Sequence, residues 1–155
     1  MNPEHMSPCG LYCGVCAVLY ATRDDNAKFK AALANLYRGK IANSDNLTAD
    51  DILCKGCLSD SPFGFCKSCE IKTCCQEKGI EGCHECNDFP CKLIEDFPMP
   101  IGKKVILRSD PYRKQHGSTK WAQDEEARYA CPGCGHQLFR GAQRCNLCKI
   151  EVDLD

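Results

Sequence analysis

Residues 54–91 decide the fold, and they read CKGCLSDSPFGFCKSCEIKTCCQEKGIEGCHECNDFPC. Nine cysteines fall within these 38 residues, and six of them form three CxxC pairs: Cys54 with Cys57, Cys66 with Cys69, and Cys83 with Cys86. Two residues between cysteines allow both thiolates to turn toward one metal ion, as they do in tetrahedral sulfur sites. The sequence therefore predicts a core that is organised by metal ions.

The composition and the N-terminal sequence indicate whether these cysteines are reduced or form disulfides. The chain has 155 residues, of which 16 are cysteine, and this length suits one domain with at most a small appendage. Its start, MNPEHMSPCG, lacks the basic region and apolar run of an export signal, and no apolar run is long enough to span a bilayer. We therefore expect a cytoplasmic protein, in which paired cysteines bind metal rather than form disulfides.

The charge of the chain argues against nucleic-acid binding. If all 16 cysteines bound four divalent ions as thiolates, the formal charge would fall from −1 to −9. One basic stretch, residues 103–120, has six Lys and Arg residues against a single acid, Asp110. A solvated helical surface explains this stretch better than a phosphate-binding patch, because aromatic interleaving is limited to Tyr112. We expect neither a nucleic-acid nor a membrane partner.

The first cysteine cluster lies in CGLYCGVC and consists of Cys9, Cys13 and Cys16. This CxxxCxxC spacing matches the signature with which radical S-adenosylmethionine enzymes hold an iron–sulfur cluster. That chemistry normally sits on a barrel of roughly 200 residues or more, which this chain cannot supply. We expect the three cysteines to bind a metal ion whose fourth ligand comes from residues 54–91.

Short helices are expected between the cysteine clusters. An apolar stripe predicts a helix over residues 24–38, with an aspartate cap before it and Gly39 after it. Thr48 and Asp51 match a capping box that starts a further short helix. These segments are expected to pack on the metal core rather than to bind a partner.

Two more helices are predicted inside and just after the central stretch. Residues 70–78 form a helix that ends at Gly79, so Cys74 and Cys75 point to different faces. Asp88 caps the next helix, which has Cys91 in its first turn, where the positive helix end favours a thiolate.

The segment between residues 99 and 130 contains no cysteine. It is expected to form a short helix that starts at Asp110 and Pro111 and stops at Gly117. A second helix over residues 120–129 carries Trp121, the single tryptophan of the chain, as a packed aromatic.

The C-terminal residues carry the most specific signal in the chain. CPGCGHQLFRGAQRCNLC places Cys131, Cys134, Cys145 and Cys148 in two CxxC pairs that are ten residues apart. Two such knuckles on the arms of a hairpin enclose one zinc ion in four sulfurs, with rubredoxin-like iron as the main competitor. Because this set is complete in itself, the sequence predicts two domains: a Cys-rich metal-binding domain over residues 1–130 and a zinc ribbon over residues 131–155.

The motifs together resemble a known family. CGLYCGVC, CKGC, FCKSCEIKTCCQEKG, GCHECNDFPC and HGSTKW are similar to the prokaryotic Cys-rich family called domain of unknown function 3795, over about Cys9 to Tyr129. The resemblance implies metal binding through these cysteines and no established reaction. With the tail, the predicted ligands are Cys9, Cys13, Cys16, Cys54, Cys57, Cys66, Cys69, Cys74, Cys83, Cys86, Cys91, Cys131, Cys134, Cys145 and Cys148.

Cys75 is the cysteine left out of this set. The family pattern has a small residue at its position, and Cys75 lies four residues after Ile71, on the same helical face. The core therefore offers eleven thiols, or twelve if Cys75 binds metal, and the spacing does not decide which of them share an ion. Eleven thiols leave a place for one histidine, for which His84 and His5 are the nearest candidates.

These observations predict a small irregular α+β fold stabilised by metal, with short helices around Cys-rich knuckles and a C-terminal zinc-ribbon hairpin. The favoured function is a zinc-binding accessory or interaction module with a protein partner. An iron–sulfur electron-transfer protein is the alternative, although no CxxCxxC run is present. No catalytic constellation indicates an enzyme, since all-sulfur zinc sites are closed, and a thioredoxin-like role lacks its βαβ context.

Overall fold

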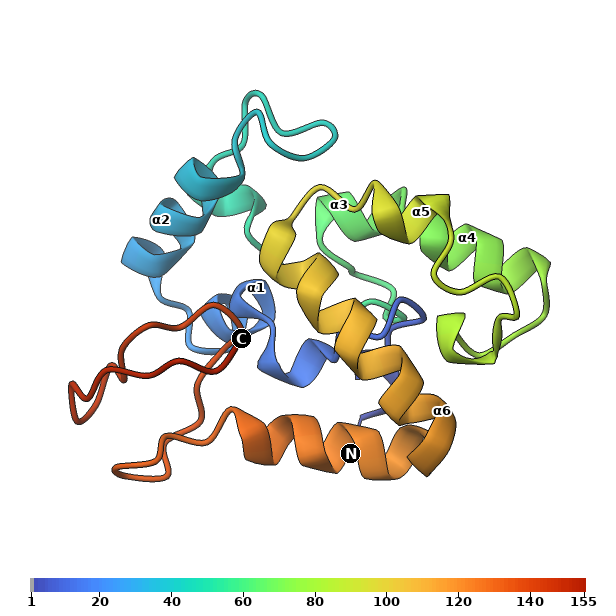
Figure 1. Cartoon of the computed structure of the whole chain (residues 1–155). Coiled ribbons are helices and arrows are strands. Elements are labelled where there is room, and N and C mark those ends of the chain that lie inside the picture. Colours follow the sequence, from blue (N-terminus) through green and yellow to red (C-terminus); the bar gives the residue numbers. More distant parts are fainter. Residues whose placement is uncertain (1) are drawn as a thin grey trace.

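The structure is a computed structural model and describes residues 2–155 (Figure 1). The described chain is mostly helical, and its β structure consists of two isolated bridges, Ala130 to Gln137 and Arg144 to Glu151. Its α-helices are α1 (Ala17–Arg23), α2 (Ala27–Tyr37), α3 (Gly64–Lys67), α4 (Glu70–Glu77), α5 (Lys92–Glu95) and α6 (Pro100–Arg128). Four short 3-10 turns complete the set, at Pro3–His5, Cys13–Val15, Ala49–Asp51 and Cys83–Glu85. The predicted knuckles between short helices are present, but the β component of the expected α+β fold is minimal.

The helices before α6 follow the predicted signals in part. The capping box is confirmed, because Asp51 accepts a hydrogen bond of 2.8 Å from the backbone N–H of Thr48. The helix α4 matches the prediction, and Gly79 follows it with a φ of 64°. Upstream, the chain forms two helices rather than one, because residues 24–26 turn and the side chain of Asn26 caps α2.

The helix α5 starts later than predicted. Asp88 does not cap it, because its carboxylate pairs with Lys78 at 2.8 Å instead. Cys91 is therefore the N-cap residue of α5 rather than a member of its first turn.

The long helix α6 differs from the two short helices that were predicted for this segment. It begins at Pro100 and continues through Asp110 and Pro111. Val105 and Ile106 are buried on one face of this helix, and their packing stabilises the helical conformation despite the proline. At Gly117 the backbone takes φ 79° and ψ 161°, so the helix bends sharply there, as Figure 1 shows. Gly117, at which the first short helix was predicted to end, is therefore the site of a kink in α6.

The apolar core is divided into small clusters around the cysteines. One cluster joins α1 and α2 to Ile52 and Cys54, and a second joins α4, α5 and α6 around Ile106. A third contains Trp121, which is fully buried as expected. Each of the first two clusters also contains cysteine, so thiols and apolar side chains pack together in the core.

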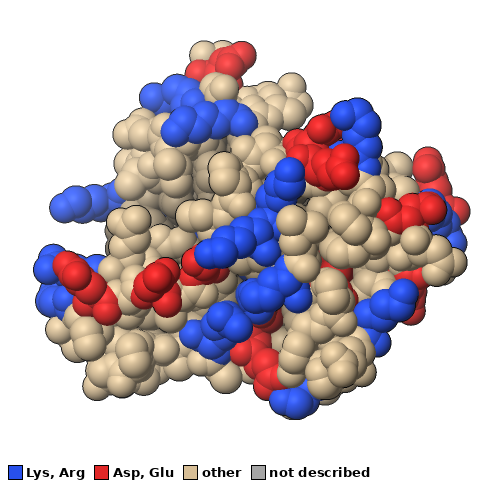
Figure 2. Space-filling view, viewed as in Figure 1, with Lys and Arg blue, Asp and Glu red and all other residues tan. Residues whose placement is uncertain are grey.

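The basic stretch of residues 103–120 is largely neutralised within the chain. Arg108 pairs with Glu125 at 2.6 Å, and Lys120 pairs with Asp124 at 2.6 Å. In Figure 2, Lys and Arg side chains gather over α6 with acidic side chains beside them. No helix of the described residues combines the length and the apolar character that crossing a membrane requires.

The C-terminal tail, residues 131–155, lies against the N-terminal helices (Figure 1). The ring of Phe139 is 5.4 Å from that of Tyr20 and 4.8 Å from that of Phe29. The Nε2 atom of His136 lies 2.9 Å from the hydroxyl oxygen of Tyr20. The division into two domains stays a prediction, but the tail shares an aromatic contact surface with α1 and α2.

Candidate metal centre

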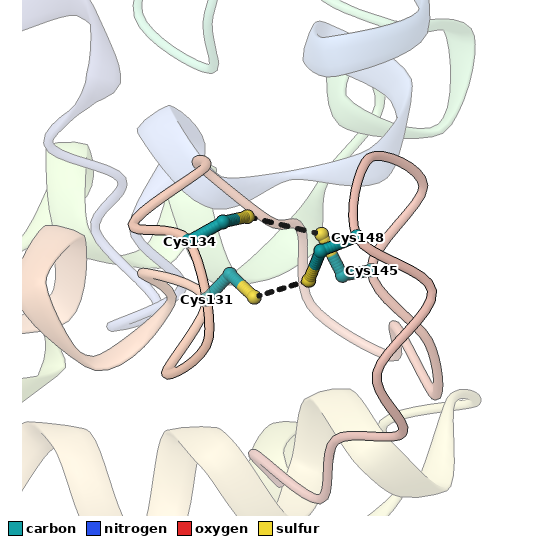
Figure 3. A group of neighbouring side chains, drawn as sticks. All are labelled: Cys131, Cys134, Cys145 and Cys148. Carbon is teal, nitrogen blue, oxygen red and sulfur yellow. Dashed lines mark hydrogen bonds between the residues drawn. The ribbon is translucent and has the colours of Figure 1, made fainter.

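Four cysteines of the tail form the tightest group of ligand atoms in the described chain. The sulfurs of Cys131, Cys134, Cys145 and Cys148 all lie within 4.8 Å of one another. Cys131 is 3.5 Å from Cys148, and Cys134 is 3.7 Å from Cys145, as the dashed lines in Figure 3 show. Four sulfurs at about 2.3 Å from one zinc ion would lie about 3.8 Å apart. The geometry therefore suits a single tetrahedral ion.

Two matching turns place these thiols. In the first knuckle Gly135 has a φ of 71°, and its N–H donates to the carbonyl of Cys131 at 2.8 Å. In the second, Lys149 has a φ of 65°, and its N–H donates to the carbonyl of Cys145 at 3.1 Å. Each knuckle is closed by one isolated bridge. Gly135 takes the left-handed position of the first knuckle, whereas nothing in the sequence indicated that Lys149 takes this position in the second.

The thiols of the tail have unequal acidity. The backbone N–H of Cys148 is the main cause that lowers the pKa of Cys145 to about 6, against the effect of burial. At Cys134, the backbone N–H of His136 lowers the pKa, but burial and the neighbouring thiols together raise it to about 12. The thiolate of Cys145 therefore forms readily, whereas a metal ion must displace the proton of Cys134.

In the core, one neighbourhood of thiols surrounds Cys57. Burial is the first cause that raises the pKa of Cys13, and the charges of Cys16 and Cys57 raise it further. Cys57 also raises the pKa of Cys66, so these side chains lie close together. The neighbourhood consists of Cys13, Cys16, Cys54, Cys57, Cys66 and Cys69, and Cys9 borders it, because burial and then Cys57 and Cys69 raise the pKa of Cys9. The structure thus brings part of the first cluster next to residues 54–69, as the sequence predicted.

Arg140 of the tail reaches this neighbourhood. Its Nη2 atom donates to the carbonyl of Tyr12 at 3.0 Å, and its backbone N–H donates to the carbonyl of Val15 at 2.8 Å. Its Nε atom is buried without a hydrogen-bond partner among the described residues. Burial is the first influence on the pKa of Arg140 and lowers it, but Cys16 and other negative neighbours raise it overall. Sequence reasoning missed this cation, because nothing in the spacing relates it to Cys16.

A second core neighbourhood encloses a small cavity of about 20 Å³. Its lining includes five cysteines: Cys74, Cys75, Cys83, Cys86 and Cys91. The sulfurs of Cys75 and Cys83 are 3.8 Å apart, and Lys78 lies 3.3 Å from the sulfur of Cys86. A cavity of this size has room for about one water-sized sphere. It suits one metal ion.

Cys74 and Cys75, which are adjacent in α4, differ in burial but line the same cavity. Cys75 is 2% exposed and packs in the same cluster as Ile71, as predicted, whereas Cys74 is half-buried. Both nevertheless line the same cavity. That Cys74 binds metal and Cys75 does not stays a prediction.

The two candidate histidines have neighbours other than the thiols. His84 is buried, and its Nε2 atom lies 3.8 Å from a carboxylate oxygen of Glu81. The ligand atoms of Glu81, His84 and Glu85 lie within 4.8 Å of one another. His5 has its Nε2 atom 3.3 Å from the side-chain amide of Asn2. Burial is the first cause that lowers the pKa of both histidines.

Helical knuckles around clustered thiols, together with the tetrad of the tail, define a cysteine-rich protein with candidate metal-binding sites. Comparison with protein families agrees, because residues 5–96 match the family described as "Protein of unknown function (DUF3795)". The match covers more than half of the chain, so the chain belongs to this family. It includes the cysteines from Cys9 to Cys91, whereas HGSTKW and the tail lie beyond it. No curated protein and no solved structure matches the chain.

Proposed function

We propose that the protein binds zinc at several structural sites and serves as an accessory module that contacts another protein. The observation that supports this most directly is the tail tetrad, whose sulfur separations of 3.5 and 3.7 Å fit one tetrahedral zinc ion. Four thiolates leave no open coordination position for a substrate or an activated water. A structural rather than a catalytic role follows.

The core cavity supports the same metal. Its lining cysteines come from three segments, as the adjacent residues Cys74 and Cys75, the pair Cys83 and Cys86, and the single Cys91, which suits an isolated ion better than the close cysteine run of many iron–sulfur proteins. An iron–sulfur electron-transfer protein is therefore the weaker proposal.

Metal analysis of protein purified without oxygen tests the proposed metal. We expect a colourless protein that contains zinc, and we expect Cys134→Ser to lose one zinc equivalent because a tail ligand is removed. Asn146→Ser, in the other knuckle of the same tetrad but without a sulfur ligand, is the matched control and should keep all its zinc. Brown protein with bound iron, or protein without metal, would contradict the proposal.

For the partner surface we propose the hollow that is lined by residues 41–67, with a volume of about 750 Å³. Its lining carries four aspartates against one lysine: Asp45, Asp50, Asp51 and Asp60 against Lys67. Leu53 lies in the same hollow and is 55% exposed. Acidic side chains around an exposed leucine favour a protein segment in which basic residues flank an apolar side chain.

A fluorescent peptide of alternating Lys and Leu is the probe for this surface. We expect the double variant Asp50→Lys and Asp60→Lys to weaken peptide binding at least 10-fold, because two attractive charges become repulsive. The double variant Glu151→Lys and Asp153→Lys, which makes the same change in net charge at two exposed positions of the tail, is the control and should bind like the wild type. If the double variant binds as well as this control, or if an alternating Glu and Leu peptide binds equally, the hollow is not a basic-segment site.

A further inference from the structure

Asp110 is a buried carboxyl group without a partner. Its side chain is 0% exposed, and neither carboxylate oxygen has a hydrogen-bond partner among the described residues. The group lies directly against the backbone of Gly10, where an added methyl group would be 2.8 Å from the carboxyl atoms. A buried carboxylate without hydrogen bonds or a counter-ion is costly, so its presence points to a ligand.

The nearest cation does not form an ion pair with Asp110. Arg113 is fully buried, and its guanidinium group contacts a carboxylate oxygen of Glu81 at 2.6 Å and the carbonyl of Ser7 at 3.0 Å. A third contact joins its Nε atom to the hydroxyl of Ser118 at 2.9 Å. Burial raises the pKa of Asp110 to about 7, against the charge of Arg113 and the nearby backbone N–H of His84, which both lower it.

Three buried thiols lie beside this carboxyl group. The sulfurs of Cys75 and Cys83 are 3.8 Å apart, which is about the separation of two sulfurs on one tetrahedral zinc ion. The negative charge of Asp110 raises the pKa of both thiols, and the charge of Cys9 acts on Cys83. Cys9, Cys75 and Cys83 belong to one core cluster, and none is more than 9% exposed.

We propose that Asp110 binds a zinc ion together with Cys9, Cys75 and Cys83. This inference rests on the proposed zinc-binding function and adds a carboxylate ligand and Cys75 to it. Zinc accepts carboxylate oxygen at about 2.0–2.2 Å beside thiolate sulfur at about 2.3 Å. No three of these four ligand atoms lie within 4.8 Å of one another in the described chain, so binding requires the side chains to rotate toward the ion.

The charge balance of such a site agrees with its surroundings. Three thiolates and one carboxylate around Zn²⁺ leave a net charge of −2, which needs positive charge nearby in a buried position. The fully buried Arg113 supplies such a charge, three residues after Asp110 on α6. Cys74, Cys86 and Cys91, which line the small cavity together with Cys75 and Cys83, are more exposed than these two thiols.

Zinc content of paired variants tests the site. We expect Asp110→Asn to lose one zinc equivalent, and Cys75→Ala to lose that same equivalent, so the double variant loses no more than either single one. Glu125→Gln is the matched control, because Glu125 is also a buried carboxylate of α6 but pairs with Arg108. It should keep the full zinc content.

X-ray absorption on the zinc-loaded wild type gives a second test that needs no variant. We expect an oxygen contribution near about 2.0 Å beside the sulfur shell near about 2.3 Å. A purely sulfur shell, or Asp110→Asn protein with full zinc, would overturn the proposed site and leave zinc binding itself intact. Wild-type protein without zinc would instead overturn the proposed function.

Discussion

Removal of the bound metal is expected to unfold most of the chain. The apolar clusters of the core are small, and two of them are built partly from cysteine side chains. A structural zinc ion supplies on the order of 10 kcal/mol in small domains. Since whole domains are stable by only about 5–15 kcal/mol, losing several ions exceeds what the apolar contacts can offset.

Far-ultraviolet circular dichroism before and after strong chelation measures this loss. Returning zinc to the chelated protein under reducing conditions is the control, and it should restore the helical signal. An unchanged spectrum in protein that is shown to be metal-free would mean that the helices are stable without metal.

The second large effect is expected from Trp121→Ala. Trp121 is 0% exposed, and its ring stacks with the guanidinium group of Arg113 at 4.4 Å and meets the ring of Tyr12 edge-on at 5.7 Å. Its indole N–H also donates to the hydroxyl of Ser109. Replacing a buried tryptophan with alanine costs about 3–5 kcal/mol through lost contacts and the cavity that remains. The two halves of α6 also lose the contacts of Trp121 with Ser109 and Arg113, which join them across Gly117 beside the Arg108–Glu125 pair.

Urea unfolding at saturating zinc measures this change, with the free energy of unfolding compared among variants. Leu107→Ala is the control on the same helix, because Leu107 is 41% exposed and should lose less than about 1 kcal/mol. Equal losses in the two variants would show that the packing of Trp121 does not stabilise the bend.

The sequence predicts those parts of the structure in which a local pattern decides the outcome. The spacing of Cys131, Cys134, Cys145 and Cys148 leads directly to a tetrad, because each knuckle is a turn of a few residues. The end of α4 at Gly79 also follows from a local preference for positive φ. By contrast, α6 continues through Pro111, because tertiary burial of its face outweighs the local start signal.

The charged groups around the thiols could not be predicted from local sequence patterns. Asp110 looked like a helix cap and Arg140 like an ordinary surface residue, because a sequence does not tell which side chains the fold will bury. Only the packing of α6 against Gly10 and of the tail against Tyr12 and Val15 brings these groups near cysteines. Polar groups that reach a site from distant segments of the chain can be identified only when the tertiary structure is known.

The contact of Arg140 with the carbonyls on either side of Cys13 has a thermodynamic consequence. In the zinc-bound protein that we propose, metal binding in the tail would hold residues 131–148 in place, and with them a guanidinium group beside the thiols of the core site. Occupation of one site would then raise the affinity of the other, and linkage makes the effect reciprocal. The two ends of the chain would therefore load and release zinc cooperatively, over a narrower range of free zinc than independent sites would show.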